Sequence, residues 1–89
     1  VMQFCADGPD DAARAAYRTV ALAMGVADPI AASRELAEAI GVRVRLSALG
    51  LTAGTVDRVA RGAVEDVVTA NSPRTPTHPE VEALLQSAL

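Results

Sequence analysis

The sequence contains no lysine and no tryptophan, and it has only one cysteine, one histidine and two aromatic residues, Phe4 and Tyr17. A single cysteine, Cys5, excludes an internal disulfide. The positive charges are all arginines and the net charge is −3, so no basic patch large enough for a phosphate backbone is present. The chain also lacks a secretory signal and an apolar run of membrane length. These absences predict a soluble cytoplasmic protein that binds neither nucleic acid nor membranes.

Alanine, valine and leucine dominate what is present, and hydrophobic residues make up 51% of the 89 residues. This length allows one small domain at most. Alanine lets helices approach closely but removes little apolar area from water, which predicts a thin core. The fold expected is all-α, a small bundle of about four to five short helices, with residues 1–89 forming a single partial domain.

The first half of the chain shows two helices with clear start and stop signals. One begins after the turn Asp7-Gly8-Pro9-Asp10-Asp11, with Pro9 in its first turn, and stops at Gly25. The other opens at Asp28-Pro29, a cap followed by proline at the first helical position, and closes at Gly41. The side chains expected to face inward from this second helix are Ser33, Leu36, Ala37 and Ile40.

The second half predicts a connection and two further helices. Residues 42–51 read as an extended segment that leads into a helical turn ended by Gly50. Thr52 is the expected cap of the next helix, whose apolar face comprises Val56, Val59, Ala60, Ala63, Val64 and Val67. Prolines at 73 and 76 predict a loop of fixed course over residues 71–76. Thr77 and Glu80 then form a capping box that starts the last helix.

A search for chemistry yields no active site. Metal sites need two to four converging ligands, whereas His78 and Cys5 are more than seventy residues apart. We interpret His78 as an exposed helix-start residue and Cys5 as a small buried hydrophobic residue. Glycines occur singly, as helix stops, and never as a phosphate-binding cluster. The chain alone is therefore expected to contain no catalytic residue, no cofactor-binding residue and no metal ligand.

A helix-turn-helix DNA-binding domain is one alternative. The stretches RELAEAIGV and LTAGTVDRVARG have the order of a helix, a glycine turn and a recognition helix. That motif has a turn of three or four residues, whereas about ten residues, VRVRLSALGL, stand between these stretches. The net negative charge of the chain also disfavours DNA binding, so this alternative is the weakest.

Four stretches in order resemble a known family. They are VMQF, AAYRTVALAMG, VRVRLSALGLTAGTVDRVARGAV and the terminal NSPRTPTHPEVEALLQSAL. Directly after VMQF, Cys5 stands where the family has an asparagine. Over nearly its whole length the sequence resembles the C-terminal helical part of the iron-dependent, or group III, alcohol dehydrogenases, which include the maleylacetate reductases. The family's Asn-Pro-Arg appears here as Ser72-Pro73-Arg74, with Asn71 one place earlier.

The resemblance implies a two-domain enzyme that uses NAD(P) and a divalent metal, Fe or Zn. It also implies that the metal is held by one Asp and three His, and that these residues and the glycine-rich turn that binds the cofactor all precede Val1. The apolar start VMQF agrees with a chain cut part-way along a longer protein. Residues 1–89 would then scaffold the helical domain, be catalytically incomplete alone, and have the remainder of the dehydrogenase chain as partner. Within the loop over residues 67–74, Val68 and Asn71 are the candidates for lining the substrate cleft.

A stand-alone helical interaction module is the other alternative. Apolar helix faces left exposed in such a small chain would serve as a homodimer or partner interface.

Overall fold

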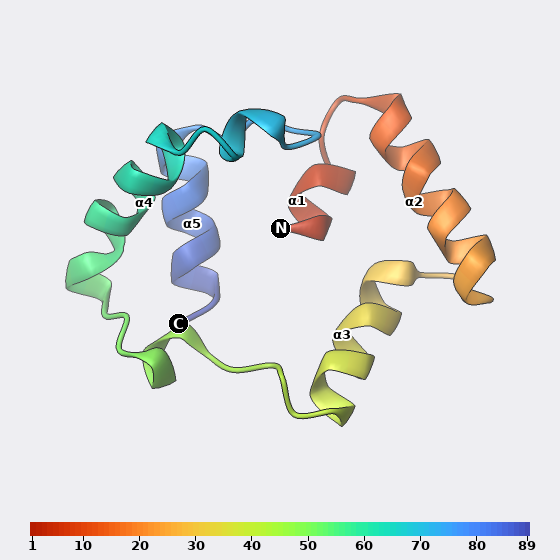
Figure 1. Cartoon of the computed structure of the whole chain (residues 1–89), viewed down its shortest axis with the longest axis horizontal. Helices are drawn as coiled ribbons and strands as arrows, with labels where there is room; N and C mark the ends of the chain where they lie inside the picture. Colours follow the sequence, from red (N-terminus) through yellow and green to blue (C-terminus); the bar gives the residue numbers. More distant parts are fainter. The chain divides into compact units, whose positions relative to one another are not determined.

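The computed structural model describes all residues 1–89, and its regular structure is all helical, with five α-helices, three short 3₁₀ turns and no strand (Figure 1). The all-α prediction is therefore confirmed. The chain divides into two compact units, Val1–Arg43 and Val44–Leu89, which are described separately below. No helix is long and apolar enough to cross a bilayer. The assignment of the chain to a single partial domain remains a prediction.

The first unit contains α1 (Met2–Ala6), α2 (Asp11–Met24) and α3 (Pro29–Ala39), with α2 in contact with both of the others. Helix α2 begins where the carboxylate of Asp10 accepts the Ala12 N–H at 2.8 Å, and it ends at Gly25 with φ +69°. Glycine is favoured where the backbone is left-handed, because glycine has no Cβ to clash. Both predicted ends are confirmed, although Pro9 precedes the cap instead of lying in the first turn.

Helix α3 begins as predicted, because the Asp28 carboxylate accepts the backbone N–H groups of Ile30 and Ala31 at 2.9 and 3.0 Å. Its inward face is only partly as predicted, because Ser33 and Ala37 are half-buried but the two larger side chains are exposed. Leu36 and Ile40 are 58% and 63% exposed. The helix is covered at its start, where Pro29 is buried and Ile30 half-buried, whereas no side chain covers these two residues in the later turns.

The core of the first unit is made of small side chains. Cys5, Ala13 and Ala21 are buried, Cys5 being 3% exposed. The prediction that Cys5 is a small buried hydrophobic residue is confirmed. Since alanine buries little area, this core contributes little stability for each residue ordered.

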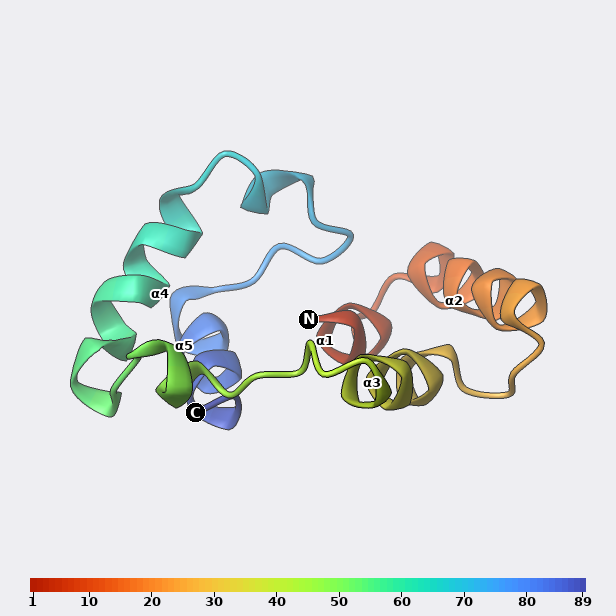
Figure 2. The ribbon, with the colours of Figure 1, turned by 60° about the horizontal axis from the view of Figure 1, so that its bottom comes forward.

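The second unit is built on two helices, α4 (Val56–Glu65) and α5 (His78–Ser87), which pack against each other (Figure 2). Val56 and Ala60 on α4 are 1% and 0% exposed, and Val81 on α5 is 8% exposed. The 3₁₀ turns η1 (Leu46–Leu49) and η2 (Ala53–Thr55) precede α4, and η3 (Thr69–Asn71) follows it. The buried side chains of Val56, Ala60 and Val81 are the core that joins α4 to α5.

The connections of the second unit follow the sequence closely, with one exception. Gly50 ends η1 with φ +92°, and Thr52 caps η2, which leads into α4. On the predicted apolar face of α4, Val56 and Ala60 are buried, but Val59 and Val64 are 39% and 37% exposed. Val67, predicted on the same face, lies beyond the end of the helix and is 81% exposed. The reason is local: Asp66 has an extended backbone, and its carboxylate accepts the Val68 N–H at 2.8 Å, which starts a new turn.

The two ends of the second unit are joined by hydrogen bonds. The Leu46 N–H donates to the carbonyl oxygen of Ala88 at 2.9 Å. The Ser47 hydroxyl donates to the main-chain oxygen of Leu89 at 2.6 Å. The start of η1 is thereby fixed to the end of α5.

Candidate functional site

The two predicted cleft residues lie in one turn between α4 and α5. Val68 precedes η3 and Asn71 ends it, and the Asn71 N–H donates to the Val68 carbonyl at 3.1 Å. Val68 is 69% exposed and Asn71 is also exposed. The structure thus brings the two residues together at the surface of the second unit, while their contact with a substrate remains a prediction.

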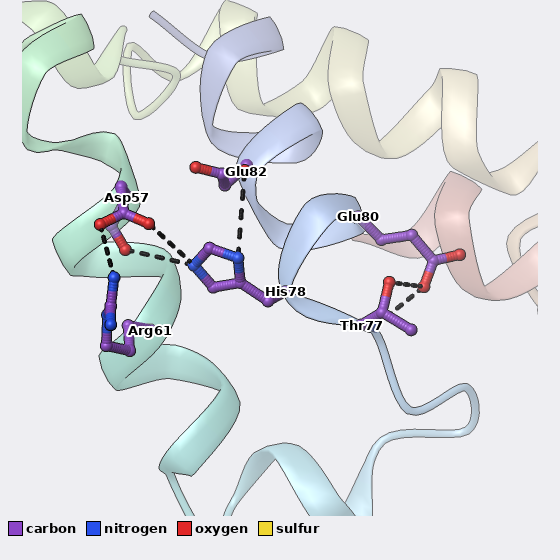
Figure 3. Close-up of polar contacts among 6 residues, drawn as sticks. All are labelled: Asp57, Arg61, Thr77, His78, Glu80 and Glu82. Atoms are coloured by element: carbon purple, nitrogen blue, oxygen red, sulfur yellow. Dashed lines mark hydrogen bonds and ion pairs between the residues drawn. The ribbon is translucent and has the colours of Figure 1, made fainter.

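A different group of polar residues converges where α4 meets the start of α5 (Figure 3). Asp57 comes from the first turn of α4, and His78 and Glu82 come from α5. The Nε2 atom of His78 lies 3.3 Å from Asp57 Oδ1, and its Nδ1 atom lies 4.0 Å from Glu82 Oε2. One donor atom from each residue can be chosen so that all three lie within 4.8 Å of one another.

The buried core explains why these side chains meet. Asp57 directly follows Val56, and Glu82 directly follows Val81, the buried residues through which α4 and α5 pack. Successive residues of a helix are about 100° apart around its axis, so a residue next to a buried one lies at the rim of the contact. His78 and Glu82 are four residues apart and share one face of α5.

Arg61 orients the carboxylate of Asp57. Its Nη2 atom lies 2.8 Å from Asp57 Oδ2, whereas Oδ1 faces His78. This hydrogen bond, followed by the charge of Asp57, raises the pKa of Arg61. Both groups are more than half exposed, so the pair orients the carboxylate without contributing much stability.

An open hollow of about 270 Å³ adjoins this group and is lined by Arg61, Val64, Glu65 and His78. His78 therefore contacts two carboxylates and also borders a space large enough for several water molecules. Glu65 also lines the hollow, and the charges of Asp57, Glu65 and Glu82 all act on Arg61. The electrostatic balance of this surface is negative.

The other side of the α5 start has a structural role. Thr77 and Glu80 form the predicted capping box, in which the Glu80 carboxylate accepts the Thr77 backbone N–H at 2.8 Å and its hydroxyl at 3.0 Å (Figure 3). The first of these bonds is the main cause that lowers the pKa of Glu80, with Arg74 adding to the effect. These contacts fix the first residue of α5, which is His78.

The first unit has a second hollow, of about 280 Å³, lined by polar residues Arg14, Tyr17 and Arg18 above an alanine floor. Partial burial, followed by the proximity of Cys5, raises the pKa of Tyr17. Arg14 is already paired with Asp11 and donates to the Gly8 carbonyl. Nothing in this hollow forms a nucleophile–base pair.

Sequence reasoning missed the grouping around His78. Its side chain is 35% exposed and packed between two carboxylates, so the interpretation as a merely exposed helix-start residue was incomplete. The spacing His-x-x-x-Glu from His78 to Glu82 could have indicated a shared helix face. Asp57 could not have been paired from sequence, because its position depends on how α4 packs against α5.

The chain is similar to one family over its full length. Residues 1–89 match the family model described as Fe-containing alcohol dehydrogenase family, C-terminal. No curated protein and no solved structure matches the chain. The match confirms the resemblance inferred from the four sequence stretches. The chain belongs to the Fe-containing alcohol dehydrogenase family, and its residues 1–89 correspond to that family's C-terminal region.

Proposed function

We propose that this chain is part of a metal-dependent alcohol dehydrogenase or carbonyl reductase, similar to the maleylacetate reductases, that moves a hydride between NAD(P)H and a carbonyl group. The observation that carries the proposal is the family match over residues 1–89. In this proposal the residues scaffold the helical domain, and Val68 and Asn71 reach the edge of the substrate cleft. A bound metal would polarise the carbonyl as a Lewis acid.

The residues of this chain do not fit the metal centre that the resemblance implies. That centre uses one Asp and three His, whereas His78 is the only histidine here. No glycine cluster suits a cofactor phosphate either. We therefore assign the binding of the catalytic metal and of the cofactor to the remainder of the enzyme and derive no catalytic step from these residues.

Exposed apolar side chains support a scaffolding role. In the first unit, Leu36, Ile40 and Val42 are each more than half exposed within one short segment. Grouped exposed apolar residues mark surfaces that contact other protein. We propose that the remainder of the dehydrogenase chain covers them. The cytoplasmic location remains an expectation.

A stand-alone interaction module is the second candidate, favoured by the same exposed residues. A homodimer would bury Leu36 and Ile40 in a symmetric interface. Sedimentation equilibrium of the 89-residue chain separates the two candidates. A dimer that Leu36→Glu converts to a monomer favours the module, whereas a monomer at all concentrations favours the scaffold.

Two experiments test the main proposal. The coding sequence upstream of Val1 is expected to continue in frame into a strand–helix pattern with a glycine-rich turn, one Asp and three His. A stop codon directly upstream would contradict the proposal. Separately, the 89-residue chain is expected to show no reductase turnover with an aldehyde, NADH or NADPH, and added Fe²⁺ or Zn²⁺. Measurable turnover would show that the chain is catalytically complete.

A further inference from the structure

We infer that Asp57, His78 and Glu82 form a binding site for a divalent transition-metal ion of the Zn²⁺ or Co²⁺ type, which joins α4 to α5. This site is separate from the metal centre that the family resemblance implies, and the inference does not depend on the proposed enzymatic function. It rests on the spacing of the donor atoms, on the chemistry of the donor set and on the open space beside it.

The distance between the first two donors suits a tetrahedral ion. Bonds of about 2.0–2.1 Å from zinc to nitrogen and oxygen place neighbouring tetrahedral ligands roughly 3.3–3.5 Å apart. Nε2 of His78 and Oδ1 of Asp57 are 3.3 Å apart. Nε2 also lies 3.4 Å from the main-chain oxygen of Asp57. Both contacts are long for hydrogen bonds, so an ion bound at Nε2 and Oδ1 would replace little.

Glu82 supplies the third ligand. Its carboxylate now faces Nδ1 of His78 at 4.0 Å, and its side chain is 37% exposed. The three residues offer donor atoms within 4.8 Å of one another, and the proposed site requires the exposed Glu82 side chain to rotate from Nδ1 toward the ion on the Nε2 side. The hollow beside His78 then gives water access to the fourth position.

The donor set selects the class of metal. Imidazole with two carboxylates suits Zn²⁺, Co²⁺ and Fe²⁺, whereas Mg²⁺ and Ca²⁺ prefer oxygen ligands alone. Arg61 holds Oδ2 of Asp57 and leaves Oδ1 directed at His78, which is the orienting role that outer partners play at metal sites. Its positive charge opposes the ion, while Glu65 offsets that charge.

Metal binding to the native arrangement must also stabilise it. The three donors come from two helices, so the unfolded chain does not hold them together, and binding free energy appears as folding stability. We expect Zn²⁺ to raise the thermal midpoint of the 89-residue chain, and EDTA to reverse the shift. Co²⁺ is expected to give visible absorption bands, with one ion bound per chain, whereas Mg²⁺ at equal concentration is expected to leave the midpoint unchanged.

Variants locate the site. His78→Gln keeps a polar side chain of similar size and is expected to weaken Zn²⁺ binding by at least about tenfold in isothermal titration calorimetry, as are Asp57→Asn and Glu82→Gln. Circular dichroism of each variant without metal checks its fold. Two control variants, Glu35→Gln on α3 and Cys5→Ser in α1, are expected to bind Zn²⁺ as the unmodified chain does.

Several outcomes would overturn the inference. Absence of a Zn²⁺-dependent shift in the unmodified chain refutes it directly. Full binding by a folded His78→Gln chain would place the ion elsewhere, and loss of binding in the Cys5→Ser chain would assign the ion to the thiol. An equal shift with Mg²⁺ would reduce the group to a non-selective acidic surface. If no selective metal site exists, His78 and Asp57 form only a hydrogen-bonded contact between two helices.

Discussion

Replacing Val56 with alanine tests whether the α4–α5 contact is the core of the second unit. Val56 is 1% exposed and is the largest fully buried side chain of the chain. The change deletes two methyl groups, worth about 1.6 kcal/mol at about 0.8 kcal/mol for each buried carbon. The cavity left between the helices adds to this cost, and the better helix propensity of alanine recovers about 0.5 kcal/mol. The first and last figures leave a loss of about 1 kcal/mol, and the cavity brings the expected net loss to about 1–2 kcal/mol.

Urea unfolding of the 89-residue chain, followed by circular dichroism at 222 nm, measures this loss. Val67→Ala is the matched control, because Val67 is 81% exposed and lies outside α4. The control is expected to stay within about 0.5 kcal/mol of the unmodified chain. Equal costs for the two substitutions, or a cost below about 0.5 kcal/mol for Val56→Ala, would refute the assignment of the core to this contact.

Three further predictions concern the helix ends. Thr77→Ala removes the hydroxyl of the α5 capping box and is expected to cost about 1 kcal/mol in urea unfolding, whereas an unchanged midpoint would show that the box is not formed. Asp28→Ala is expected to cost a similar amount, about 1 kcal/mol, and to increase amide hydrogen exchange at Ile30 and Ala31, whose N–H groups it caps. The third concerns pH. The pKa of Glu80 is lowered in the folded chain from an ordinary value of 4.5, so its contribution is complete above that value and is lost as pH falls through the lower folded pKa. Stability measured between neutral pH and pH 3 should therefore fall less steeply in Glu80→Gln than in the unmodified chain, and parallel pH profiles would contradict the assignment.

Local signals explain why the helix boundaries could be predicted from sequence. The Asp28 carboxylate accepts from backbone N–H groups two and three residues on, and Thr77 forms its capping box with Glu80, three residues on. These effects need no knowledge of the rest of the fold. The same holds for Gly25 and Gly50, whose positive φ values end a helix and a turn. The start, the capping residue and the end of these helices could be predicted because the interactions that set them act within one helical turn.

The predictions that failed depended on contacts between helices that are distant in sequence. An apolar stripe shows which face of a helix could be buried, not whether another element covers it. Leu36 and Ile40 belong to such a stripe and are nevertheless exposed. His78 and Asp57 are 21 residues apart in sequence, and only the packing of Val56 and Ala60 against α5 brings them together. The candidate metal site therefore required the structure.

The hydrogen bonds that join the two ends of the second unit bear on the order in which it folds. Ser47 and Leu89 are 42 residues apart, whereas α4 and α5 are joined by a much shorter connection. Closing a loop costs more entropy as it lengthens, by about 0.6 kcal/mol for each doubling. Docking of α5 on α4 is thus expected to precede attachment of η1, which makes the pairing of Leu46 with Ala88 a late step and the first to open when the unit unfolds.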